Sequence, residues 1–227
     1  MKKAPQEYSL HSAFTMLELI FVIVVTGILA AIIIPSTKTN PLQEAAIQLL
    51  SHIRYTQHLA MVDDKYDASD AQWYKGRWQI VFSKNVKTNN QEAYTIISDA
   101  PRYSGDPSVS EIAKNLQNNS LLMSGGYTGT VKLDVNHNSF IGMKKLNIGM
   151  SYGIDDVSLS GGCSNSRVSF DHLGRPFTGD QSTMTGPYSA GTQRLITRNC
   201  IITLIHIDGN DLNISIEPET GYARINF

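Results

Sequence analysis

The chain has little charge and little cysteine for its length, and both shortages exclude classes of function. Charged residues make up 17% of the 227 residues, below the quarter that is usual in globular proteins, and the formal net charge is −1. This balance gives no bulk attraction for nucleic acid or anionic lipid. The 2 cysteines occur without a CxxC or a paired His–Cys spacing, so a zinc site is not predicted.

The motifs of common enzyme and metal sites are missing as well. Gly-x-Ser-x-Gly, His-Glu-x-x-His and a phosphate-binding loop do not occur. The stretch Asp134-x-Asn136-x-Asn138 imitates the start of a calcium loop, but Ser139 replaces the turn glycine and Lys145 replaces the closing glutamate. The sequence therefore predicts a protein that is not an enzyme and that holds no metal or cofactor.

One long apolar run lies near the N-terminus, and it contains a single carboxylate, Glu18. A charge inside an apolar helix is costly unless it is paired, so its presence indicates a functional partner. A secretory signal peptide would have a small-x-small site after the apolar region, and none follows here. An ordinary single-span anchor accounts for the hydrophobicity but not for the acid.

The residues Ala13-Phe14-Thr15-Met16-Leu17-Glu18, followed by LIFVIVVTGILAAIIIP, resemble the processing site and N-terminal helix of the type IV pilin and pseudopilin superfamily. The resemblance implies cleavage between Ala13 and Phe14 by the prepilin peptidase, which also acts as a methyltransferase on the new amine of Phe14. It also implies that this amine pairs with Glu18 of a neighbouring subunit during assembly. The family usually has glycine where Ala13 stands.

These features divide the N-terminal part into a leader peptide, 1–13, and a transmembrane and assembly helix, 14–35. Lys2 and Lys3 mark the leader side as cytoplasmic. The sequence therefore predicts a single-pass protein of the bacterial inner membrane, with its C-terminal domain in the periplasm.

A second, amphipathic helix is predicted within 36–62. Asn40 is a suitable N-cap, Pro41 suits the first helical position, and Gln43 suits a capping box. Apolar residues then recur at helical spacing as far as Ala60. The apolar face of an amphipathic helix packs against a hydrophobic surface, and a sheet formed by the rest of the chain is the simplest candidate for that surface.

The remainder, 63–227, is predicted to be a β-rich domain that forms one globular unit with 36–62. Alternating apolar residues predict strands, and a hairpin turn is predicted at 208–211. A short helix is expected at 108–117 and a surface loop at 178–192. The fold class is therefore α+β and pilin-like, with the amphipathic helix packed on an antiparallel sheet. The strand segments lie at 78–82, 131–135, 168–170, 201–207, 212–216 and 222–227.

Two segments near the C-terminus, 167–175 and 219–225, give a second resemblance. The pattern RVSFDHLGR, an apolar hairpin and then ETGYARI is similar to minor pseudopilins of the H type in type II secretion and to FimT-like minor pilins. The resemblance implies a structural subunit of a pseudopilus, whose partners are other pilins or pseudopilins and the inner-membrane assembly platform. Two alternatives stay open: a minor pilin of a type IV pilus or DNA-uptake machine, and a sorting or adhesive module that binds through 178–192 and the exposed sheet face.

The same C-terminal segment bears on DNA binding. FimT-like proteins that take up DNA are similar to one another in a Gly-Arg-x-Arg end, and the matching residues here, 221–224, keep only Arg224. Arg194, Arg198 and Arg224 are then the candidate phosphate contacts, and acidic residues nearby offset them. Nucleic acid is therefore not predicted as a partner.

Cys163 and Cys200 are the candidates for a disulfide. An exported domain lies in a compartment where disulfides form. Against a bridge, Cys163 precedes the strand at 167–171 and Cys200 opens the strand at 201–207. If those strands were antiparallel neighbours, the two sulfurs would lie at opposite ends of the pair. The sequence leaves both possibilities open.

Overall fold

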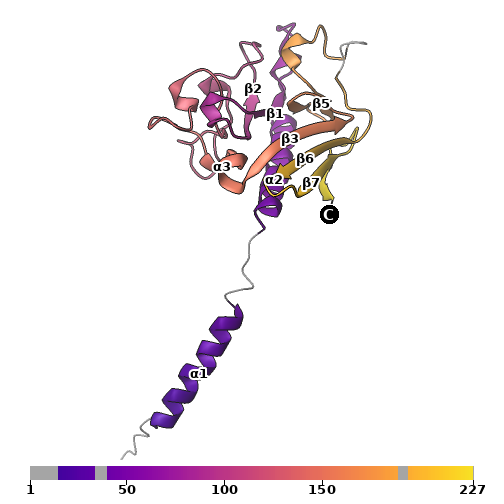
Figure 1. Ribbon diagram of the computed structural model, residues 1–227. Coiled ribbons are helices and arrows are strands. Elements are labelled where there is room, and N and C mark those ends of the chain that lie inside the picture. Colours follow the sequence, from indigo (N-terminus) through magenta and orange to yellow (C-terminus); the bar gives the residue numbers. More distant parts are fainter. Residues whose placement is uncertain (1–14, 34–39, 189–193, 227) are drawn as a thin grey trace, which may run out of the picture. The chain divides into compact units, whose positions relative to one another are not determined.

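The computed structural model describes residues 15–33, 40–188 and 194–226, and it divides the chain into two compact units. The first unit, Met1–Thr39, contains helix α1 (Met16–Ile33), and the second is Asn40–Phe227 (Figure 1).

The first unit corrects the expectation of a membrane-spanning helix at 14–35. Helix α1 has 18 residues, and at 1.5 Å per residue it is about 27 Å long. A bilayer core is about 30 Å thick. Within the described residues, no helix is both long enough and apolar enough to cross a membrane.

The second unit begins with the amphipathic helix α2 (Pro41–Val62). Its start confirms Asn40 as the N-cap and Pro41 in the first turn: the Asn40 side chain accepts a hydrogen bond from the Gln43 amide at 3.3 Å. The Gln43 half of the predicted capping box stays a prediction. Its inward face consists of small and branched apolar residues, which allow strands to approach closely. The buried residues of α2 are Leu42, Ala45, Ala46, Leu49, Ile53, Thr56 and Ala60.

In the described part of the chain, eight strands form two four-stranded antiparallel sheets rather than one. The first sheet has the order β2-β1-β4-β5 and the second β3-β6-β7-β8. Helix α2 contacts β1 and β4 of the first sheet and β6, β7 and β8 of the second, so a single helix serves both sheets (Figure 1). The strands are β1 (Trp78–Ser83), β2 (Ala93–Ser98), β3 (Ile154–Gly161), β4 (Arg167–Phe170), β5 (Pro176–Thr178), β6 (Cys200–His206), β7 (Asp211–Ile216) and β8 (Ala223–Asn226).

The main core lies between α2 and the two sheets. Ile80 and Phe170 come from the first sheet and Ile202 and Ile214 from the second, and all four are buried in one cluster with Leu49 of α2. Fully burying side chains of this size stabilises by roughly 1.5–3 kcal/mol each. A smaller cluster includes Val81 of β1 and Ile97 of β2, which pack with residues of the segment 109–133.

That segment contradicts two local predictions. The expected strand at 131–135 is instead the 3-10 helix η5 (Val131–Leu133). The Thr130 side chain caps it, and the Leu133 amide bonds back to the Thr130 carbonyl at 3.0 Å. The helix expected at 108–117 is only η4 (Val109–Glu111). The remaining short helices are η2 (Trp73–Gly76), η3 (Val86–Thr88), η6 (Lys144–Leu146), α3 (Ile148–Tyr152) and η7 (Gln181–Thr183).

The loop predicted at 178–192 is more ordered than its composition suggests. Within its described part, η7 buries the Gln181 side chain, and Met184 is 2% exposed. The Tyr74 hydroxyl donates to the Met184 carbonyl at 3.2 Å. These contacts attach the first half of the segment to the domain, and residues 189–193 lie outside the described part.

Candidate functional site

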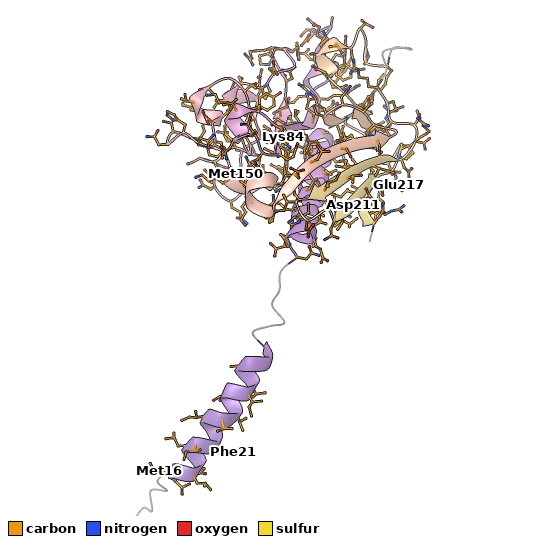
Figure 2. The ribbon with its side chains drawn as sticks, viewed as in Figure 1. Met16, Phe21, Lys84, Met150, Asp211 and Glu217 are labelled. Carbon is orange, nitrogen blue, oxygen red and sulfur yellow. A yellow bond between two sulfur atoms is a disulfide. The ribbon has the colours of Figure 1, made fainter. Side chains whose placement is uncertain are left out.

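Helix α1 presents an apolar surface that nothing in its own unit covers. Each described large apolar side chain along it is at least 36% exposed, and Met16 and Leu17 are 80% exposed or more. Figure 2 shows the side chains of Met16 and Phe21 projecting from the helix. Helices that are apolar all round are usually buried in folded assemblies or membranes, and large exposed apolar surfaces commonly mark interaction sites.

Glu18 lies in the first turn of α1 and forms a reciprocal cap with Thr15. Its carboxylate accepts hydrogen bonds at 3.2 Å from both the amide and the hydroxyl of Thr15. The Thr15 hydroxyl in turn accepts from the Glu18 amide at 3.2 Å. This is a Thr-x-x-Glu capping box, whose signature is visible in the sequence although it was not among the predicted caps. Glu18 therefore has a local structural role in addition to the one that the family resemblance implies.

The cap also fixes where the charge lies. A carboxylate in the first turn interacts favourably with the positive end of the helix dipole. Leu17, Ile20, Phe21 and Val24 line a shallow apolar hollow with Glu18. The charge is thus held beside an apolar surface at the helix N-terminus. Ala13 and Phe14, the predicted cleavage and methylation residues, lie outside the described residues.

The apolar helix contains one polar residue in its middle turns, Thr26, and it is satisfied locally. Its hydroxyl donates to the carbonyl of Val22 at 2.8 Å and to that of Ile23 at 3.1 Å. A threonine that bonds to its own preceding turn adds no unpaired donor to the surface. The described surface of α1 therefore has one ionisable group, Glu18.

In the second unit, Cys163 and Cys200 form a disulfide with their Cα atoms 4.9 Å apart. The geometric objection from the sequence was wrong because it assumed the wrong neighbouring strands. Strand β4 belongs to the first sheet, whereas β6 pairs with β3, and Gly161 at the end of β3 lies opposite Cys200. Cys163 follows β3 by two residues, so the sulfurs meet at the same end of the pair.

The two C-terminal sequence segments meet at the side chain of Gln57 on α2. Its Nε2 donates to the Gly174 carbonyl at 2.9 Å and to the Thr220 carbonyl at 2.8 Å. Gly174 and Gly221 have φ values of +79° and +64°, a region that favours glycine. A Cβ at Gly221 would lie 2.3 Å from the Gly174 carbonyl oxygen. The glycines of the two segments are therefore required for a close contact of two turns on α2.

The three arginines considered for DNA do not form an unopposed basic surface. Arg224 makes an ion pair with Glu217 at 3.1 Å. A terminal guanidinium nitrogen of Arg194 donates to the Thr183 hydroxyl. Arg198 is exposed on the approach to β6. Arg194 and Arg224 are therefore engaged by other side chains, which makes them less available to neutralise phosphates.

The Asp134 carboxylate, in the segment whose sequence resembles a calcium loop, is bonded to other groups of the protein. Its carboxylate accepts from the Lys87 ammonium at 2.9 Å and from the Asn136 amide at 3.1 Å. Among the described residues, no group of three or more His, Cys, Asp or Glu side chains is arranged to hold a metal ion.

Comparisons with known proteins found no relative of this chain. No protein-family model, no curated protein and no solved structure matches the chain. The interpretation of the site therefore depends on its own residues and contacts.

Proposed function

We propose that this chain is a minor pseudopilin, a structural subunit of a type II secretion pseudopilus that assembles through its processed N-terminal helix. The observation that supports the proposal most is the combination found in α1: an apolar surface without a covering partner, and one carboxylate held in the first turn. In a filament, the equivalent helices of neighbouring subunits would cover this surface. We propose packing among subunits as the role of α1.

The proposed assembly begins with the prepilin peptidase, which would cut before Phe14 and methylate the new amine. A free α-amino group is positive at neutral pH. The amine of one subunit would then meet Glu18 of its neighbour within an apolar environment, where an opposite charge is needed to offset the cost of burying either group. The inner-membrane assembly platform and other pseudopilins are the partners in this step.

The second unit would be the periplasmic part of the subunit. Its Cys163–Cys200 disulfide fits an oxidising compartment. We propose no catalysis, metal or cofactor for it. Among the alternatives, DNA uptake is the less favoured because Arg224 is paired with Glu217.

The capping box allows an experiment that separates the charge of Glu18 from its helix cap. Glu18→Gln removes the charge and keeps a side chain suited to the capping box, whereas Thr15→Ala removes the cap hydroxyl and keeps the carboxylate. We expect Glu18→Gln to give stable protein that fails to enter filaments, and Thr15→Ala to assemble at close to the normal level. The measurement is crosslinking of each full-length variant to neighbouring pseudopilins in cells. Normal incorporation of Glu18→Gln would contradict the pairing role.

A further inference from the structure

Two of the four outer edges of the two sheets form bridges with other segments, and a third, that of β8, is short. The outer edge of β2 forms bridges from Thr95 to Ser124 and from Ile97 to Ile112. The outer edge of β5 forms a bridge from Phe177 to Leu195. Strand β8 is only 4 residues long, and the Arg54 guanidinium donates to its first carbonyl, on Ala223, at 2.8 Å.

The fourth edge, that of β3, is long and open. Strand β3 has 8 residues, and in the described part of the chain no strand or bridge lies on the side away from β6. Most of its residues are exposed. Proteins usually shorten, cover or otherwise protect an edge of this length, because its free amides and carbonyls can pair with another chain.

The hydrogen-bond pattern identifies which amides of β3 face this open edge. The Gly162 amide donates to the Asn199 carbonyl at 2.8 Å, in register with the antiparallel pairing of β3 and β6. Because such pairs alternate along an antiparallel ladder, the amides of Ser158 and Ser160 point towards β6. Those of Val157 and Leu159 point away from it.

The side chains of β3 define the kind of segment that would fit beside it. Val157 and Leu159 are half-buried against the main core. Asp155 and Asp156 are exposed at the start of the strand, and Asp156 shares a row with exposed Asp211 across β6. The Lys84 ammonium bonds to the backbone carbonyl of Asp155, and no ion pair to either β3 carboxylate is found among the described residues.

We propose that the open edge of β3 binds an extended segment of a partner protein as an additional strand. Main-chain hydrogen bonds from Val157 and Leu159 would give the affinity, as in other cases of strand addition. The segment would have apolar residues at alternate positions, to continue the face of Val157 and Leu159. It would have a lysine or arginine where it meets Asp155 and Asp156. The pairing of β3 with β6 shifts register between Ile154 and Asp156, but from Asp156 to Gly161 each residue of β3 pairs with one residue of β6.

The test uses the full-length chain and two synthetic peptides. One is a seven-residue peptide of alternating threonine and valine with a lysine at each end, and the control has glutamate at each end. Amide hydrogen exchange is measured at Val157 and Leu159. We expect fast exchange without peptide, at least tenfold slower exchange with the lysine peptide, and little change with the glutamate peptide. Ser158 and Ser160 should be protected throughout.

Charge reversal supplies the matched variant. Asp155→Lys combined with Asp156→Lys changes exposed side chains, so the fold should be kept, and the preference should switch to the glutamate peptide. Slow exchange at Val157 and Leu159 without peptide would overturn the proposal, as would equal protection by both peptides or by neither. The assay does not involve cleavage or α1, so its failure would leave the proposed filament role untouched.

Discussion

Gln57 shows how one side chain can determine the conformation of two distant turns. The Gln57 side-chain amide donates to the carbonyls of Gly174 and Thr220, and so links the turn at Gly174 to the turn at Gly221. Such a contact requires a backbone that only glycine adopts easily at these two positions.

We therefore predict that Gly221→Ala destabilises the domain by about 2–3 kcal/mol, since it adds strain at positive φ and a clash with the Gly174 carbonyl. Gly209→Ala is the matched control, because Gly209 has φ +85° but a Cβ added there would have no neighbouring atom within 4 Å. It should cost only about 1 kcal/mol, the lower end of the cost of a left-handed backbone for a residue with a Cβ. Urea unfolding followed by tryptophan fluorescence measures both, and equal costs would contradict the steric part of the argument.

Buried Glu92 and half-buried His52 give the stability of the domain a dependence on pH in opposite directions. Burial raises the pKa of the Glu92 carboxyl to about 7, opposed by Lys84 and assisted by Asp156. Burial lowers the pKa of the His52 imidazole to about 4. The Glu92 carboxyl therefore costs stability as pH rises towards 7, because the unfolded state loses its proton first. The His52 imidazole costs stability as pH falls below its ordinary 6.5, because the unfolded state gains its proton first.

Glu92→Gln should therefore stabilise the protein at pH 8 by about 1–2 kcal/mol relative to wild type, and should have little effect at pH 4, where the carboxyl is mostly neutral in both states. Thermal unfolding of wild type and variant across this range measures the difference. A Glu92→Gln variant that is no more stable than wild type at pH 8 would contradict this prediction. It would show that the Lys84 ion pair, at 3.7 Å, outweighs the cost of burying the Glu92 carboxylate.

For single residues, the sequence was informative where the chemistry is local. The Asn40 cap of α2 depends on residues three apart, and its prediction is confirmed. The Thr15–Glu18 box has the same local form and could have been predicted. The acceptors of Gln57 lie 117 and 163 residues away, so no local pattern indicates them.

Among the secondary-structure elements, the disulfide joins the end of β3 to the start of β6. It closes a loop with a sequence separation of 37 residues, which in the chain-entropy model corresponds to roughly 4 kcal/mol. We predict that replacing both Cys163 and Cys200 by alanine lowers the free energy of unfolding by about 3–4 kcal/mol. Urea unfolding of the double variant beside the oxidised and reduced wild type measures this. Identical midpoints for the oxidised and reduced wild type would contradict a structural role for the bond.

Most of the strands that were predicted have apolar residues at alternate positions in the sequence. Strand β7 alternates and was expected, whereas β2 is buried along its whole length and therefore lacks alternation. Strand β3 was not predicted either. Without it, the order of the second sheet and the position of Cys163 beside Cys200 could not be derived. Division into two sheets depends on strand pairing across long separations, which no local pattern specifies.

Across the molecule, the two units differ in how they are stabilised. The unit from Asn40 onwards has a continuous core around α2. Helix α1 has no core of its own, and its apolar side chains are exposed within its own unit. The proposed pseudopilin function depends on this difference, since assembly would supply the contacts that α1 lacks.

The most direct test of this account is the N-terminus of the protein isolated from its native cells. If the chain is a processed pseudopilin subunit, sequencing should give a mature protein that begins FTMLE, with Phe14 first and its amine methylated. Cleavage there would produce the positive group that Glu18 is proposed to meet. A protein that begins at Met1, or at any residue beyond Pro35, would contradict the account.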